Sequence, residues 1–348
     1  MKGRPEVTDA AATKRTWFNG RHAIAAVVLI YLPMLPTLAF APLGLTAAVG
    51  PFLLGAMAAM LAAILIGGRF ALLVAGLVAL FNFAAVLVSS LPILAGLVMG
   101  VAALLYGITA RRGVSSVLVI APISVAFTVA DPATIFTGAS TLTNATVVGG
   151  VALAGALWGW IIGAVLGRRV STPSPTGIPL REAVAFAVIV AVVAGVTTGV
   201  VVALQLQHGG AWILLTILLL IQPDYHLSWQ RTGHRIIGTV IGFGIALAIG
   251  LIISQPTINL LLGMLMLTIA VYLKLDSTRP YWQFVAFLTP GIVLAEGAGG
   301  DVVNTDVARL WFTLVGAAIA IAVLVVAKLV VKDSGMSAGS SDDVSVAQ

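Results

Sequence analysis

The stretch AVAFAVIVAVVAGVTTGVVVAL, residues 183–204, decides the fold class of this 348-residue chain. Apolar and small residues fill every face of a helix drawn over it, so no face is suited to water. A helix needs about 20 apolar residues to cross the ~30 Å hydrocarbon layer of a bilayer. A strand of a transmembrane barrel would instead alternate polar and apolar residues, and this stretch does not. It therefore predicts a membrane-spanning helix.

The same composition continues through the rest of the chain. Hydrophobic residues make up 60% of it and charged residues 9%, whereas a soluble domain carries about a quarter charged residues. Cysteine is absent, which excludes disulfides and thiolate metal sites. We therefore predict an all-α, polytopic membrane helix bundle of about 12 transmembrane helices. The predicted spans are residues 23–41, 44–66, 70–89, 92–110, 115–130, 147–166, 183–204, 209–222, 236–253, 257–275, 281–298 and 308–331.

The positive charges divide unequally between the two sides of this predicted bundle. With a cytosolic N-terminus, all of the 18 Lys and Arg residues except Arg309 fall on the cytosolic side. Cytosolic segments of membrane proteins carry such an excess of Lys and Arg, and shifting the count by one helix would scatter the charges. We therefore predict a multi-pass protein of the plasma or inner membrane with both termini in the cytosol.

The chain divides into two halves that are joined by RRVSTPSPTGIPL, residues 168–180, a composition that favours an extended surface segment. Arg111 precedes Pro122 by the same distance as Arg279 precedes Pro290. Six helices in each half give both halves one orientation, as in transporters with parallel repeats. The predicted regions are a cytosolic tail 1–22, a first six-helix half 23–167, a cytosolic linker 168–180, a second half 181–332 and a disordered cytosolic tail 333–348.

Two stripes of small residues predict close contacts between helices. Small residues four apart in a membrane helix let a neighbouring backbone approach closely. The stripes are Gly155, Gly159, Gly163 and Gly167 in the first half, and Gly238, Gly242, Ala246 and Gly250 in the second.

The stretch IQPDYHLSWQRTGHRIIGTVIG, residues 221–242, gathers charged and aromatic residues between two apolar runs. Pro223 ends one helix, a short polar loop follows, and Arg231 and Arg235 precede a Gly-Thr-x-x-Gly motif. Together with the preceding HGGAWILLTILLLIQP, this pattern resembles the aromatic acid exporter superfamily, also called the fusaric acid resistance (FUSC)-like family. The resemblance is clearest over residues 181–331. The long cytosolic domain of larger relatives is reduced here to the short linker.

The family pattern is faint in the first half. There, only Arg69 in GGRFALLVAGLVAL stands at the point equivalent to the arginines of the second half. The resemblance implies an inner-membrane permease that exports small organic anions such as aromatic carboxylates. It also extends to plant aluminium-activated malate transporters, which keeps a passive anion channel open as an alternative. A non-transporting membrane subunit or scaffold is a third reading.

Arg231 and Arg235 are the first candidates for substrate binding. They are one helical turn apart, so at the start of the span 236–253 they can present two cations near the positive end of a helix dipole. The planar fork of arginine bonds both oxygens of a carboxylate. The alternative is structural: both residues set topology, reach lipid phosphates or pair with Asp224.

The remaining candidates lie in or near interrupted spans. Pro122 and Pro290 occupy corresponding places in the two halves, and paired helix interruptions point to the substrate region of a repeat transporter. Trp282 and Phe287 give the span of Pro290 aromatic faces, which suit either a ligand or packing. Asn82 is a rare polar residue deep in a span, and it suits either an interhelical hydrogen bond or the pathway.

No predicted span carries Asp, Glu, Lys or Arg near its centre, so the sequence gives no support for proton coupling. Phosphate-loop, zinc-protease and nucleophile-elbow motifs are also absent. We therefore expect no enzyme activity, no catalytic residue, no cofactor and no metal. The expected partners are a small organic anion and membrane lipids, with no nucleic acid. A homo-oligomer and an accessory envelope subunit stay open.

Overall fold

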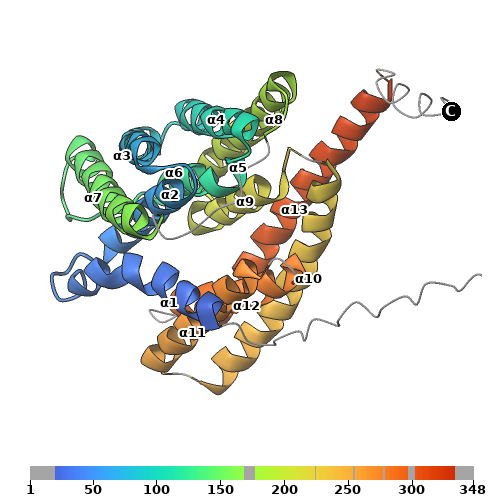
Figure 1. Ribbon diagram of the computed structural model, residues 1–348. Helices are drawn as coiled ribbons and strands as arrows, with labels where there is room; N and C mark the ends of the chain where they lie inside the picture. The colour runs from blue at the N-terminus through green and yellow to red at the C-terminus, as the bar shows by residue number, and fades with distance from the viewer. Residues whose placement is uncertain are drawn as a thin grey trace, which may run out of the picture.

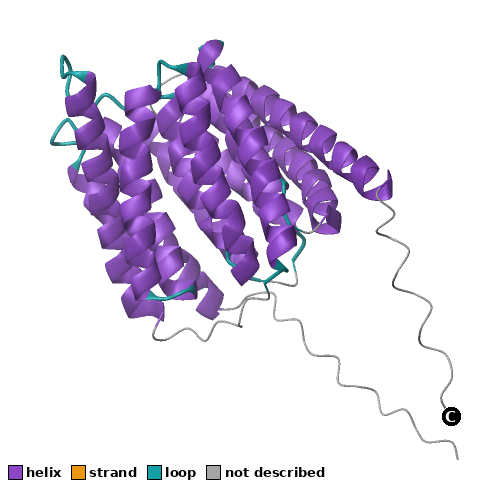
Figure 2. Cartoon of the chain, turned by 90° about the horizontal axis from the view of Figure 1, so that it is seen from above, coloured by secondary structure: helices purple, strands orange, loops and turns teal. Residues whose placement is uncertain are grey.

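The computed structural model describes residues 20–167, 177–223, 225–253, 255–276, 279–296 and 302–333. Helices are the only regular elements among these residues, and they run roughly side by side in one bundle (Figures 1 and 2). The helices are α1 (Gly20–Met34), α2 (Val49–Leu65), α3 (Gly68–Val88), α4 (Pro92–Ile108), α5 (Ser115–Leu118), α6 (Ile120–Ala130), α7 (Thr141–Gly167), α8 (Leu180–Ala203), α9 (Gln207–Leu220), α10 (Tyr225–Ile252), α11 (Pro256–Leu275), α12 (Tyr281–Glu296) and α13 (Val302–Asp333).

Apart from the four-residue α5, each of these helices corresponds to one predicted span. Nine of the described helical segments are long and apolar enough to cross a membrane, and α6, α9 and α12 are shorter apolar helices. The predicted all-α, polytopic membrane bundle is confirmed. The two predicted tails and most of the linker lie outside the described residues, so the domain boundaries stay a prediction.

The two halves repeat one set of helix pairings. α2 packs against α7 as α9 packs against α13, and α3 packs against α6 and α7 as α10 packs against α12 and α13. The first helix of each half crosses to the other: α8 packs against α4, and α1 packs against α11 (Figure 1). These matching contacts support the proposal of an internal repeat.

Both stripes of small residues form close helix contacts. A Cβ atom added at Gly159 of α7 would lie 1.9 Å from the carbonyl oxygen of Ala56 on α2. One added at Gly238 of α10 would lie 2.6 Å from the carbonyl oxygen of Trp282 on α12. Since real Cβ atoms do not approach this closely, only glycine permits these contacts, as the spacing predicted.

Two helices differ from their predicted spans in ways that change the site. α10 begins at Tyr225 rather than near residue 236, so Arg231 and Arg235 lie inside the helix and not at its start. α13 begins at Val302 rather than near residue 308, so Arg309 lies about two turns inside the helix and not at its start. In both places, tertiary packing continues a helix through residues that hydropathy alone assigns to a loop.

The two prolines are not equivalent in detail. Pro290 lies in the interior of α12, as predicted. Pro122 lies in the first turn of α6 rather than mid-span, because the predicted span 115–130 is interrupted at Val119. Proline has no N–H and its ring clashes with the carbonyl of the fourth residue before it, which here is Leu118, the last residue of α5.

Candidate anion site

A small cavity lies between α9, α10, α12 and α13 in the second half. Its volume is about 10 Å³, close to the smallest space that holds one water molecule. Among the described residues, the polar part of its lining consists of two guanidinium groups, three threonine hydroxyls and one indole, with no carboxylate. The lining residues are Trp212, Arg235, Thr239, Phe243, Thr289, Arg309, Leu310 and Thr313.

Arg235 is buried in this cavity, with 5% of its surface exposed. It lies within the apolar segment Trp229–Ile252, about 15 Å along α10 at 1.5 Å per residue. Its Nε and Nη1 atoms have no hydrogen-bond partner among the described residues. An ionised side chain inside a membrane protein is costly, and such residues mark binding sites and ion pathways.

Arg309 reaches the same cavity from α13, and 7% of its surface is exposed. Its Cζ atom lies 3.6 Å from the centroid of the Trp212 ring, a cation–π contact between α13 and α9. Arg309 was not among the residues that the sequence pattern predicted for the site. The available signal was that Arg309 alone broke the charge pattern that set the topology.

Thr239 lies one helical turn after Arg235 on α10. Its hydroxyl is buried and has no hydrogen-bond partner among the described residues. A buried polar group without a partner is expensive, and native proteins keep few of them. Hydrogen-bond donors from two cations and a hydroxyl that line one cavity are suited to an anion.

Arg231 lies outside this cavity, although it precedes Arg235 by one turn. Its Cζ atom is 5.9 Å from the centroid of the Tyr281 ring on α12. Nζ of Lys274, from α11, lies 5.1 Å from the same centroid. The two predicted arginines therefore serve different places: Arg235 faces the cavity, and Arg231 belongs to a cluster where α10, α11 and α12 meet.

The aromatic candidates line a third place. Trp282 and Phe287 border a groove of about 600 Å³ between α1, α11 and α12. Arg235 does not line it. Pro290 is buried beside the cavity: a Cβ atom added at Gly242 would lie 2.9 Å from its Cδ, and the preceding Thr289 lines the cavity itself.

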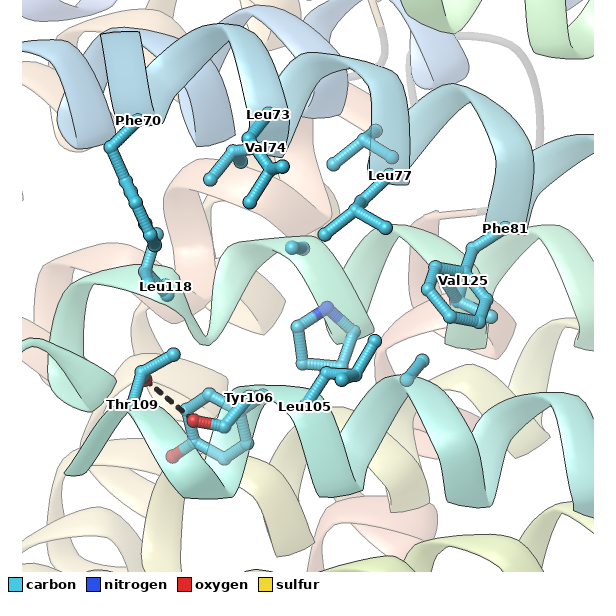
Figure 3. A pocket seen from close by; sticks show the side chains of 14 residues that line it. Phe70, Leu73, Val74, Leu77, Phe81, Leu105, Tyr106, Thr109, Leu118 and Val125 are labelled. Atoms are coloured by element: carbon cyan, nitrogen blue, oxygen red, sulfur yellow. Dashed lines mark hydrogen bonds between the residues drawn. The ribbon is translucent and has the colours of Figure 1, made fainter. Parts of the chain in front are cut away.

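Pro122 borders a cavity of about 70 Å³ in the first half, between α3, α4 and the α5–α6 segment (Figure 3). The lining is almost entirely apolar, with rings from Phe70, Phe81 and Tyr106. The structure therefore places the two prolines in different chemical surroundings.

Asn82 lies in a hydrogen-bonded cluster between α3 and α6. Its amide nitrogen donates to Ser124 Oγ at 3.0 Å and to the carbonyl oxygen of Val78 at 2.7 Å. Its amide oxygen accepts a hydrogen bond from Thr128 Oγ1. The described residues contain no group of three or more His, Cys, Asp or Glu side chains that could hold a metal ion.

Comparison with known proteins finds similarity in the second half. Residues 194–323 match the family described as fusaric acid resistance protein-like. The inner membrane protein YccS of Escherichia coli K12 is 33% identical over 113 residues, and an uncharacterized protein of Haemophilus influenzae is 34% identical over 111 residues. The uncharacterized protein slr1298 of Synechocystis is 31% identical over 116 residues.

Each of these alignments covers 32% of this chain and 15% of the relative, so the chain spans a small part of the curated relatives that it matches. No solved structure matches the chain. The family match over residues 194–323 includes Trp212, Arg235, Pro290 and Arg309. The resemblance that the sequence predicted is confirmed: residues 194–323 of this multi-pass membrane protein are similar to the fusaric acid resistance protein-like family.

Proposed function

We propose that the protein is an inner-membrane permease that exports small organic anions, with aromatic carboxylates as the substrate class. One observation carries the proposal: Arg235 is buried in a membrane-spanning bundle, its Nε and Nη1 donors lack partners among the described residues, and a second arginine lines the same cavity. A carboxylate supplies a negative charge and two acceptor oxygens to the Arg235 donors.

The cavity also offers aromatic surface. Trp212 and Phe243 line it together with the arginines, so a substrate ring can stack beside a carboxylate that the guanidinium groups hold. A volume of about 10 Å³ does not admit such a substrate, so binding requires the helices around the cavity to separate. A closed cavity of this kind favours a carrier with gated access over a permanently open channel.

Export is compatible with the charge of the substrate. With a negative cell interior, moving one negative charge outward gains ~2.3 kcal/mol per 100 mV. The membrane potential is therefore a sufficient driving force for an organic monoanion, and the proposal needs no buried carboxylate for proton coupling.

Flux in proteoliposomes tests the function. The purified full chain is reconstituted, and radiolabelled benzoate uptake is measured with and without unlabelled benzoate inside. We expect saturable uptake with counterflow, and a loss of at least about tenfold in Arg235→Gln and in Arg309→Gln. Arg69→Gln, at an exposed arginine, serves as the matched control. An ohmic benzoate current would indicate a channel instead of a carrier. The absence of any flux would contradict transport and support a non-transporting subunit.

The proposed orientation has its own test, because the chain contains no cysteine. Gln205, which follows α8, and Gln230, near the start of α10, are exposed at opposite ends of the second half. In intact cells, we expect a membrane-impermeant thiol reagent to label Gln205→Cys and not Gln230→Cys. The reverse pattern would overturn the cytosolic placement of the termini and the outward direction of transport.

A further inference from the structure

The described lining of the closed cavity supplies no negative charge to Arg235. The guanidinium group of arginine carries a positive charge, and the side chain of Arg235 is buried. Removing an ion from water costs several kcal/mol unless a counter-charge and hydrogen bonds compensate it. The described residues that line the cavity include no Asp or Glu, and within this part of the chain Nε and Nη1 of Arg235 have no hydrogen-bond partner.

The size of the cavity limits what can supply the missing charge. About 10 Å³ is close to the space of a single water molecule, so an organic acid does not fit while the helices are closed. A water molecule would fit, but it carries no charge. An anion of one atom satisfies both requirements.

The donors around the space suit such an ion. Arg235 offers Nε and Nη1, and the buried hydroxyl of Thr239 lies one turn further along the same helix. Arg309 adds a second positive charge from α13, with its guanidinium held against the Trp212 ring. Cationic and hydroxyl donors around one small space form a site for a halide.

We propose that the closed cavity binds one monovalent inorganic anion, chloride being the ordinary case, on Arg235, Arg309 and Thr239, and that a substrate carboxylate displaces it. The halide site rests on the cavity alone. The displacement step rests on the proposed transport function. Two consequences follow: chloride stabilises the closed protein, and chloride competes with the organic anion for the site.

The first test measures halide binding without transport. The purified full chain is held in gluconate buffer at constant ionic strength while chloride replaces gluconate, and the unfolding temperature is recorded. A ligand that binds only the folded state raises that temperature progressively with its concentration. Iodide should also quench a saturable part of the tryptophan fluorescence, and Trp212→Phe should remove that part.

Matched variants assign the effect to the cavity. Arg235→Gln should abolish the chloride dependence, and Thr239→Val, which keeps the side-chain shape, should weaken chloride binding by roughly tenfold. Arg231→Gln, one turn earlier and outside the cavity, should keep the dependence. The site is refuted if the wild-type protein unfolds at the same temperature in chloride and gluconate, or if Thr239→Val and Arg235→Gln both respond as the wild type does.

Flux separates this inference from the proposed function. Halide binding without benzoate flux would overturn the transport proposal and leave the halide site standing. Benzoate flux with no halide stabilisation would overturn the halide site and leave the transport proposal standing. Benzoate flux whose half-saturating concentration does not change with chloride, in a protein that does bind halide, would refute the displacement step.

Discussion

The two halves of the bundle pair their helices in the same way but bury different chemistry. Between α3 and α6, the amide of Asn82 meets the hydroxyls of Ser124 and Thr128 in a neutral cluster whose members bond one another. Around α10, the corresponding helix of the second half, Arg235 and Thr239 are buried with donors that lack partners among the described residues. A satisfied cluster holds helices together, whereas an unsatisfied one costs stability and is retained where a ligand completes it.

The residues at which α3 and α10 begin explain much of this difference in buried chemistry. The sequence pattern predicts that Arg69 and Arg235 correspond to each other in the two halves, yet Arg69 is exposed and Arg235 is buried. α3 begins at Gly68, directly before Arg69, after Gly67 with a positive φ of 119°. α10 begins at Tyr225, so the same type of residue lies well inside the bundle. Moving an arginine along its helix therefore changes a surface charge into a buried one.

The largest effect is expected at the glycine contacts that both halves share. Gly159→Val should prevent stable folding, since even a Cβ atom there would overlap the backbone of α2, and overpacking costs about 1–3 kcal/mol or more. The measurement is the yield of monodisperse protein in detergent. Gly150→Val is the control, because a Cβ atom at Gly150 meets nothing within 4 Å. Equal yields for the two variants would contradict the tight α2–α7 contact.

The second-largest expected effect is an increase in stability. Arg235→Met should raise the unfolding free energy in gluconate by about 1–4 kcal/mol, because an apolar side chain of similar length replaces a buried cation. Arg69→Met, at the exposed position that the sequence pattern predicts to correspond, should stay within about 0.5 kcal/mol of the wild type. Denaturant unfolding in detergent measures both variants. If Arg235→Met instead lowers the unfolding free energy, Arg235 stabilises the fold, and its burial is not a destabilising feature kept for ligand binding.

Asn82→Leu tests the neutral cluster of the first half and should lower the unfolding free energy by about 1 kcal/mol, typical of hydrogen bonds between membrane helices. The loss is small because both hydroxyls can turn to carbonyl groups of their own helix. Thermal unfolding of the variant gives the stability, and benzoate uptake by its folded fraction separates the packing role from the predicted pathway role. A loss of uptake with unchanged stability would return Asn82 to the substrate pathway.

The sequence was sufficient for the architecture because membrane helices reveal themselves locally. Long apolar runs such as residues 183–204 predicted the spans, and each predicted span has a helix. The start of α10 was not predictable in this way. Residues 225–235 are largely polar, so hydropathy puts the start of the span near residue 236. In the structure, α10 packs against α12 and α13, and Arg235 is buried.

The candidate site was predicted in part. The family pattern and the chemistry of carboxylates selected Arg235, and the structure places it in a cavity. Arg309 was missed because the site is assembled from helices that are distant in the chain, and spacing along one helix does not reveal such contacts. Trp282 and Phe287 were selected as aromatic residues near Pro290, but they face the other side of α12, toward α1 and α11.

The smallest effect is expected in the apolar cavity of the first half. Leu77→Phe should fill part of the 70 Å³ space and change the unfolding free energy by less than about 1 kcal/mol, since added contacts and added crowding oppose each other. Chloride-dependent stabilisation should be unchanged, because Leu77 lies in the other half. The control is Leu72→Phe, at an exposed position on the same helix. If Leu77→Phe blocks benzoate uptake while Leu72→Phe does not, the cavity beside Pro122 lies on the transport route, and the division into a structural half and a binding half is wrong.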